Sequence, residues 1–94
     1  MAVVTNPAEK TKSAIYNSII YPKVAIVDPE LVVSAPPHIT ASTGWDVFCH
    51  AFEATLHVNA SPYTDLMALE AIRLVVRYLP TAIEDGANLE AREA

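Results

Sequence analysis

The sequence describes a short, acidic and strongly apolar chain: its 94 residues carry a formal net charge of −5, and 52% of them are hydrophobic. This apolar content is too high for a disordered tail, and the six Lys and Arg residues form no cluster of the kind that binds nucleic acid. No apolar run approaches the ~20 residues of a membrane span, and the N-terminus lacks the pattern of a signal peptide, so we expect a cytoplasmic protein without a membrane or nucleic-acid partner.

The first part of the chain is predicted to form short β-strands. Residues 2–5 are β-prone, a turn is expected at residues 6–8, and residues 14–16 suit a second short strand. The clearest strand prediction is KVAIV at residues 23–27, which is β-branched, apolar and suited to a sheet that is covered on both faces. A proline-rich connector at residues 28–37 then separates this strand region from a helical region.

The first helix is predicted to begin near residues 40–43 and to end near Val58. Ser42 and Thr43 are the candidate N-caps, because a side-chain oxygen just before a helix can accept a hydrogen bond from one of its free N–H groups. Most residues of this helix are apolar around its whole circumference, so we expect it to be deeply buried.

The second helix has a stronger start signal, because Ser61 is a candidate cap and Pro62 suits the first helical position. We expect this helix to stop at Pro80, since proline removes a helical hydrogen bond. Its charged face is expected to carry Glu70, Arg73 and Arg77, and its apolar face Leu66, Leu69, Ile72, Val76 and Leu79. A third helix should start at Asn88, and the sequence ends before it completes two turns, so we expect the polypeptide to continue.

Four polar residues form a narrow line along the first helix: Asp46, His50, Glu53 and His57 fall at i, i+4, i+7 and i+11. The line is either the solvent face of an amphipathic helix or a metal site, since a carboxylate and an imidazole one turn apart suit Fe²⁺ or Zn²⁺. Two ligands are too few for a protein site. The others would come from Glu53 or His57, from a second copy of the chain at a two-fold axis, or from further sequence.

Three other residues invite a functional interpretation. Cys49 is the only cysteine, which excludes an internal disulfide. It lies ~100° around the helix from His50, so we interpret it as a small buried apolar residue and not as a ligand of the same ion. We interpret His38 as an exposed loop histidine, and Asp28 as a turn or cap residue.

The segment TGWDVFCHAFEA resembles the signature of the iron-containing, group III alcohol dehydrogenases, which is roughly T-G-x-D-x-x-x-H-A-x-E-A. The resemblance extends in both directions. PKVAIVDPEL and the following PP resemble the last strand and linker of the family, NASPYTDLMALEAIRL resembles its next helix, and DGANLEAREA resembles the helix after that. The resemblance therefore covers nearly the whole chain, in order.

The resemblance implies a fragment of a two-domain enzyme, with an α/β and an all-α domain, and this chain should be mostly α-helical with short N-terminal β-strands. Residues 1–33 would end the dinucleotide-binding α/β domain, and residues 34–94 would start the C-terminal all-helical metal-binding domain. By resemblance, Asp46 and His50 match the first two metal ligands, and Lys12 matches a lysine near the nucleotide. The implied activity is hydride transfer between a small alcohol or aldehyde and NAD or NADP, with Fe²⁺ or Zn²⁺ as a Lewis acid.

Two parts of the family pattern lie outside this sequence: the glycine-rich cofactor loop and the two histidine ligands of later helices. At smaller departures from the family, Trp45, Cys49, Thr55 and His57 replace the residues usual at those positions. We therefore expect the fragment to be inactive alone, and to form a homo-oligomer or to associate with the remaining parts of its parent enzyme. The alternative is a non-enzymatic helical module that self-associates or binds a partner through exposed apolar surface.

Overall fold

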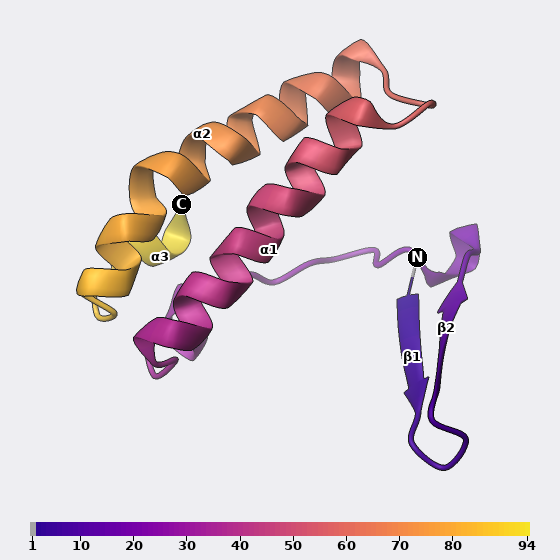
Figure 1. The fold of residues 1–94 in the computed structure, drawn as a ribbon, viewed down its shortest axis with the longest axis horizontal. Coiled ribbons are helices and arrows are strands. Elements are labelled where there is room, and N and C mark those ends of the chain that lie inside the picture. Colours follow the sequence, from indigo (N-terminus) through magenta and orange to yellow (C-terminus); the bar gives the residue numbers. More distant parts are fainter. Residues whose placement is uncertain (1) are drawn as a thin grey trace.

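The computed structural model describes residues 2–94 and shows a β-hairpin set apart from a pair of long antiparallel helices (Figure 1). In chain order the elements are β1 (Ala2–Asn6), β2 (Thr11–Ile15), a 3₁₀ turn (Ser18–Ile20), a second 3₁₀ turn, η2 (Pro29–Val32), α1 (Pro37–Leu56), α2 (Pro62–Glu84) and α3 (Leu89–Glu93). This confirms the predicted fold class for the chain, mostly helical with a short N-terminal sheet. Among the described residues no helix is both long and apolar enough to cross a membrane.

The hairpin forms because a local turn joins two β-prone segments. β1 and β2 are antiparallel, with Ala2 opposite Ile15 and Asn6 opposite Thr11. The Oδ1 atom of Asn6 accepts a hydrogen bond from the backbone N–H of Ala8 at 3.1 Å, which is the usual way in which asparagine stabilises a turn. The register carries β2 back to Thr11, so the second strand begins three residues before the predicted segment 14–16.

The strand predicted at residues 23–27 is wrong for this chain. The segment has no regular secondary structure, and the side chains of Val24, Ile26 and Val27 are exposed. A strand needs a hydrogen-bonded neighbour, and β1 and β2 pair only with each other within the described part of the chain. The β-propensity of KVAIV is therefore not realised here. Asp28, as predicted, is a cap: its Oδ1 accepts from the N–H of Glu30 at 3.0 Å at the start of η2.

The predicted start of the first helix is also wrong, because α1 begins at Pro37, with Pro36 as the residue before it. Proline fits the first helical position well, since it has no N–H to satisfy and its φ is already near the helical value. Ser42 and Thr43 lie inside the helix, where the Thr43 hydroxyl donates to the Ile39 carbonyl at 2.8 Å. His38 is exposed as expected, but it lies in the first turn of α1 and not in a loop.

α2 begins as predicted and ends later. The Ser61 Oγ accepts from the N–H of Thr64, and Thr64 Oγ1 accepts from the N–H of Ser61, so the two residues form a reciprocal cap. The helix continues through Pro80 to Glu84, which corrects the predicted stop. The turn after the proline places Ala82 in the buried region, and that packing offsets the lost hydrogen bond. α3 starts after Asn88, whose Oδ1 accepts from the N–H of Ala91, as predicted.

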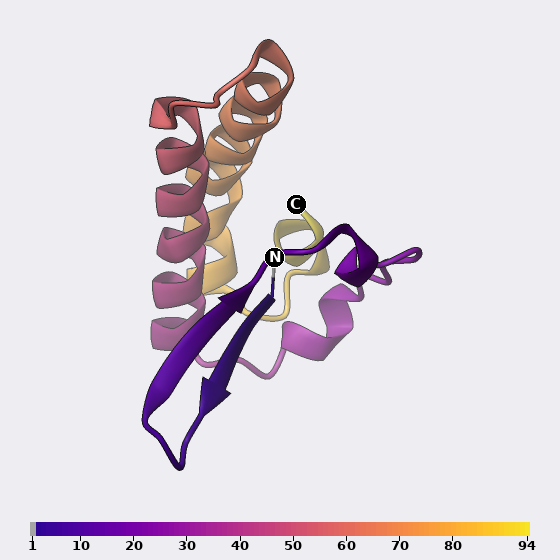
Figure 2. The ribbon, with the colours of Figure 1, turned by 90° about the vertical axis from the view of Figure 1, so that its right-hand side faces the viewer.

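The buried region lies between α1, α2 and α3, and α3 folds back against α2 and η2 (Figures 1 and 2). The buried residues are Thr40, Ala51, Ala68, Ala82 and Ala91. The expectation that α1 is deeply buried is wrong in this chain, since Trp45 is 60% exposed. Leu66, Leu69 and Val76 of α2 are exposed as well, so the predicted apolar face of α2 is only partly buried. In a pair of helices, each helix covers only one side of the other. Apolar side chains on the remaining sides of α1 and α2 are therefore exposed in the described part of the chain.

Candidate metal centre

α1 places Asp46 and His50 together because it is an unbroken helix over this region. The two residues lie one turn apart, and Nε2 of His50 is 3.9 Å from Oδ2 of Asp46. Their side chains are 71% and 75% exposed respectively. This exposure leaves both donor atoms accessible to a group that arrives from solvent.

The other two residues of the predicted line lie less favourably. Glu53 is exposed on α1, whereas His57 follows the helix and has an extended backbone with ψ of 141°. The His57 Nδ1 already accepts a hydrogen bond from the N–H of Asn59 at 3.1 Å. A shallow hollow of about 470 Å³ is lined by His50, Glu53, Ala54, His57, Asn59, Ala60 and Thr64. Across residues 2–94, however, no three His, Cys, Asp or Glu residues come close enough to hold an ion.

Asp46 and His50 fit two positions of a divalent metal site, because one carboxylate and one imidazole converge on the same exposed face. A site normally needs three or four protein ligands. The hypothesis that His57 completes the site within one copy of the chain is not supported, since the described residues form no three-ligand group. One copy of the chain therefore brings only two candidate ligands, Asp46 and His50, together within the described residues.

The remaining candidate residues do not join this pair in a cluster of possible ligands within the described residues. Lys12 is exposed on β2, and the hairpin stands away from α1 in Figure 1. Cys49 is half-buried and has no disulfide partner, consistent with its interpretation as a packing residue. On the exposed side of α2, Arg73 donates two hydrogen bonds to the Glu70 carboxylate, and these lower the Glu70 pKa from its ordinary value. That ion pair belongs to the solvent face expected from the sequence.

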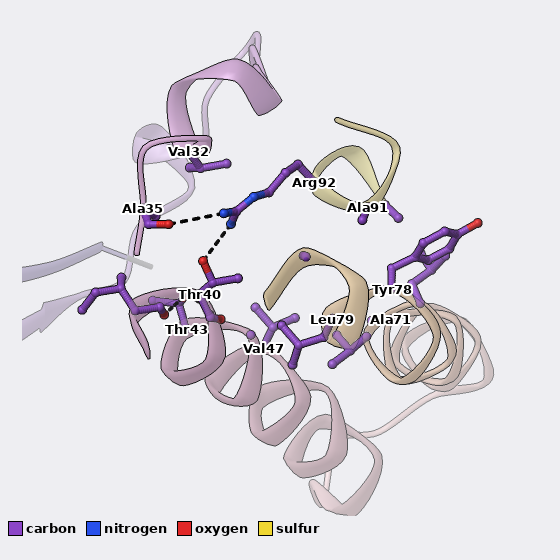
Figure 3. A pocket seen from close by; sticks show the side chains of 16 residues that line it. Val32, Ala35, Thr40, Thr43, Val47, Ala71, Tyr78, Leu79, Ala91 and Arg92 are labelled. Atoms are coloured by element: carbon purple, nitrogen blue, oxygen red, sulfur yellow. Dashed lines mark hydrogen bonds between the residues drawn. The ribbon is translucent and has the colours of Figure 1, made fainter. Parts of the chain in front are cut away.

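A second hollow lies between the helices and is mostly apolar. It has a volume of about 510 Å³ and is lined by residues of η2, α1, α2 and α3, among them Val47, Leu79 and Arg92 (Figure 3). No pattern in the sequence distinguishes Arg92 from the other charged residues. The structure shows its guanidinium bonded to residues of two other segments, Ala35 and Thr40. From the sequence, Arg92 is simply an arginine in the predicted third helix. Arginine is a good helix former, so its presence there indicates no contact with a distant segment.

Comparison with known proteins gives matches of three kinds. Residues 40–94 match the model described as "Fe-containing alcohol dehydrogenase family, C-terminal". The chain is 51% identical over 90 residues to the 1-propanol dehydrogenase PduQ of Salmonella typhimurium, and 46% identical over 94 residues to the NAD-dependent methanol dehydrogenase of Bacillus methanolicus. These alignments cover 96% and 100% of this chain, and 24% and 25% of the two relatives.

The third kind of match is structural. The crystal structure of sulfoacetaldehyde reductase from Bifidobacterium kashiwanohense in complex with NAD+ matches with a TM-score of 0.89 at 46% identity, over 97% of this chain and 24% of that one. The open arrangement of hairpin, connector and helices is therefore also found within a much larger protein. This chain spans about a quarter of the length of the relatives it matches. The family match covers more than half of the chain and includes both Asp46 and His50. The chain therefore belongs to the Fe-containing alcohol dehydrogenase family.

Proposed function

We propose that this chain forms part of a metal-dependent alcohol dehydrogenase that transfers hydride between an alcohol or aldehyde and NAD or NADP. One observation carries the proposal: within the family-matched residues, α1 presents Asp46 and His50 side by side on an exposed face. Two relatives support this proposal, because one is a 1-propanol dehydrogenase and the other is an NAD-dependent methanol dehydrogenase.

In this proposal Asp46 and His50 hold the ion, Fe²⁺ or Zn²⁺, and do not exchange protons with the substrate. The bound ion supplies Lewis-acid chemistry at the oxygen of the alcohol or aldehyde. The Asp46 carboxylate contributes negative charge and the His50 imidazole a neutral nitrogen, and the rigid helix fixes the spacing between them. The remaining ligands come from residues beyond these 94, so the chain alone does not oxidise alcohols.

We further propose that residues 1–33 belong to the dinucleotide-binding part of the enzyme and residues 34–94 to its helical, metal-binding part. The separation of the hairpin, β1 and β2, from the helices supports a division of this kind, whereas η2, at the end of residues 1–33, packs against α3 (Figure 1). Lys12 is proposed to lie near the nucleotide. Its exposed ammonium group on β2 is suited to pairing with a phosphate as a point charge.

A dehydrogenase assay of the full-length enzyme, with 1-propanol and NAD, tests the proposal. Asp46→Ala and His50→Ala are each expected to reduce NADH formation to the background rate, because each removes a donor atom from the ion. Glu53→Ala is the matched control, since Glu53 is an exposed acid on the same helix and outside the pair; it should retain activity. Wild-type rates in both the Asp46 and the His50 variant would contradict the proposed role of these residues.

A second candidate function is favoured by the exposed apolar side of α1. Trp45, Phe52 and Leu56 are all exposed there, and the ring of Phe48 stacks between those of Trp45 and Phe52. Such a surface would serve a non-enzymatic module that associates with itself or with a partner.

Sedimentation velocity of the 94-residue chain distinguishes this module from a metal site shared between two copies of the chain. An oligomer that is unaffected by metal and lost in Phe52→Ser favours the module. A dimer that requires Zn²⁺ and is lost in Asp46→Ala favours a site shared between two copies.

A further inference from the structure

Arg92 makes the long-range side-chain contacts of this fold. Its Nη1 donates to Thr40 Oγ1 at 2.9 Å and its Nη2 to the Ala35 carbonyl at 3.4 Å, across 52 and 57 positions of sequence (Figure 3). Its Nε donates to the Gly86 carbonyl at 3.0 Å. The other side-chain hydrogen bonds of residues 2–94 are local to single turns and caps. One guanidinium therefore joins the connector, the first turn of α1 and the turn before α3.

The surroundings of Arg92 are built to accept it. Thr40 is only 5% exposed and is the one buried polar residue of the described chain. A methyl group at Gly86 would lie 3.1 Å from Arg92 Nη2, so a glycine leaves room for the guanidinium. No carboxylate pairs with Arg92 within residues 2–94. Its donors are used on neutral oxygens, the carbonyls of Gly86 and Ala35 and the hydroxyl of the buried Thr40, and the planar fork of arginine suits such a fixed arrangement.

Ala35 and Thr40, which accept hydrogen bonds from Arg92, lie on the two sides of the junction between the connector and α1; we call this junction the joint. Ala35 is in the connector between η2 and α1, beside the proposed boundary between residues 33 and 34. Thr40 is in the first turn of α1, six residues before Asp46, a helical distance of about 9 Å. A continuous helix transmits any movement of its first turn to the turns that follow. The position of Asp46 and His50 relative to the connector therefore depends on the hold that Arg92 has on Ala35 and Thr40.

We propose that Arg92 is a positioning residue that fixes the joint between the connector and α1, and so sets where the Asp46–His50 pair lies relative to the cofactor-binding part. The effect on the position of the Asp46–His50 pair relative to the cofactor rests on the function proposed above. When the joint loosens, the metal ligands and the nucleotide residues remain intact, but the alcohol and the nicotinamide are less often at hydride-transfer distance. Misplacement by about 1 Å can reduce a rate about 100-fold.

The joint itself is tested in the full-length protein without any assay of activity. Spin labels at Leu31→Cys in η2 and Glu53→Cys in α1, in a Cys49→Ser background, report the distance across the joint; both labelled positions are exposed. Arg92→Met and Thr40→Val should broaden the distance distribution, and Thr40→Ser, which keeps the hydroxyl, should preserve that of the wild type. Identical distributions in all four proteins would overturn the inference, whether or not the proposed enzymatic function holds.

The functional consequence is tested in the full-length enzyme by deuterium isotope effects with deuterated 1-propanol. Arg92→Met and Thr40→Val should lower kcat about tenfold or more and raise the isotope effect on kcat/KM, with unchanged metal content and NAD affinity. The kcat and the isotope effect of Arg92→Lys should lie between those of Arg92→Met and the wild type, and those of Thr40→Ser should match the wild type. Arg73→Met is the control for the loss of a surface arginine and should also match the wild type. A fall in kcat that tracks the folded fraction, with an unchanged isotope effect, would reduce Arg92 to a purely structural role.

Discussion

Gly44 shows how a single residue sets the contact between α1 and α2. A Cβ atom at this position would overlap the side chain of Leu79, which packs against the glycine. Alanine has the better helix propensity by about 1 kcal/mol, but overpacking typically costs about 1–3 kcal/mol. The second effect is the larger one, because Leu79 is held between the two helices.

We therefore expect Gly44→Ala to lower the free energy of unfolding by about 1 kcal/mol, measured by urea denaturation of the full-length enzyme. Ser42→Ala is the matched control: it lies on the exposed side of the same helix, and its gain in propensity should raise stability slightly. Equal stabilisation by both substitutions would show that Leu79 moves aside without cost.

The sequence could predict the proximity of Asp46 and His50, but it could not predict the contacts of Arg92. Asp46 and His50 are four residues apart on one helix, so helical periodicity alone brings them together, and the structure shows them adjacent. Their assignment as metal ligands depends on the family and stays a prediction. The bonds of Arg92 to Ala35 and Thr40 join distant segments, and no local pattern could indicate them.

Single elements are specified by their ends more than by their interiors. α2 begins where the sequence predicts, because Ser61 and Pro62 act locally at its first turn. The predictions at Pro37 and Pro80 were wrong for opposite reasons. Proline suited the start of α1 better than the polar residues that follow, and in α2 the packing beyond Pro80 outweighed the missing hydrogen bond. The strand predicted at residues 23–27 is not formed because β1 and β2 pair only with each other within residues 2–94, which leaves that segment no neighbouring strand.

The cap at Ser61 gives a prediction at the scale of the element. Ser61→Ala removes the acceptor for the Thr64 N–H, and should destabilise α2 by about 1 kcal/mol. Ser61→Asp keeps an acceptor at the same place and adds a favourable charge at the helix N-terminus, so it should match or exceed the wild type. Chemical denaturation of the full-length enzyme measures both, and an unchanged midpoint for Ser61→Ala would show that Thr64 alone caps the helix.

The whole molecule is open. Its accessible surface is 7662 Å², whereas a compact monomer of 10.2 kDa would expose roughly 5,300 Å². Its radius of gyration is 15.5 Å, against about 12 Å for a compact chain of this length. The same open arrangement occurs within the larger sulfoacetaldehyde reductase. The apolar side chains of α1 and α2 are exposed in this chain, and its relatives contain about four times as many residues.

This shape predicts weak cooperativity for the 94-residue chain by itself. Its buried apolar residues are alanines, and none of the large apolar side chains among residues 2–94 is fully buried, so little hydrophobic free energy opposes unfolding. We expect the isolated chain to bind a hydrophobic dye and to melt over a broad temperature range. A sharp calorimetric transition in a monomer would contradict this prediction.

The central claim is that Asp46 and His50 are two ligands of a metal site completed by residues beyond this chain. The most direct test is the metal content of the full-length enzyme, purified anaerobically and measured by mass spectrometry alongside Asp46→Ala, His50→Ala and Glu53→Ala. We predict about one Fe²⁺ or Zn²⁺ per subunit in the wild type and in Glu53→Ala, and loss of that ion in the other two variants with helical content unchanged. Stoichiometric metal in both Asp46→Ala and His50→Ala would contradict the account.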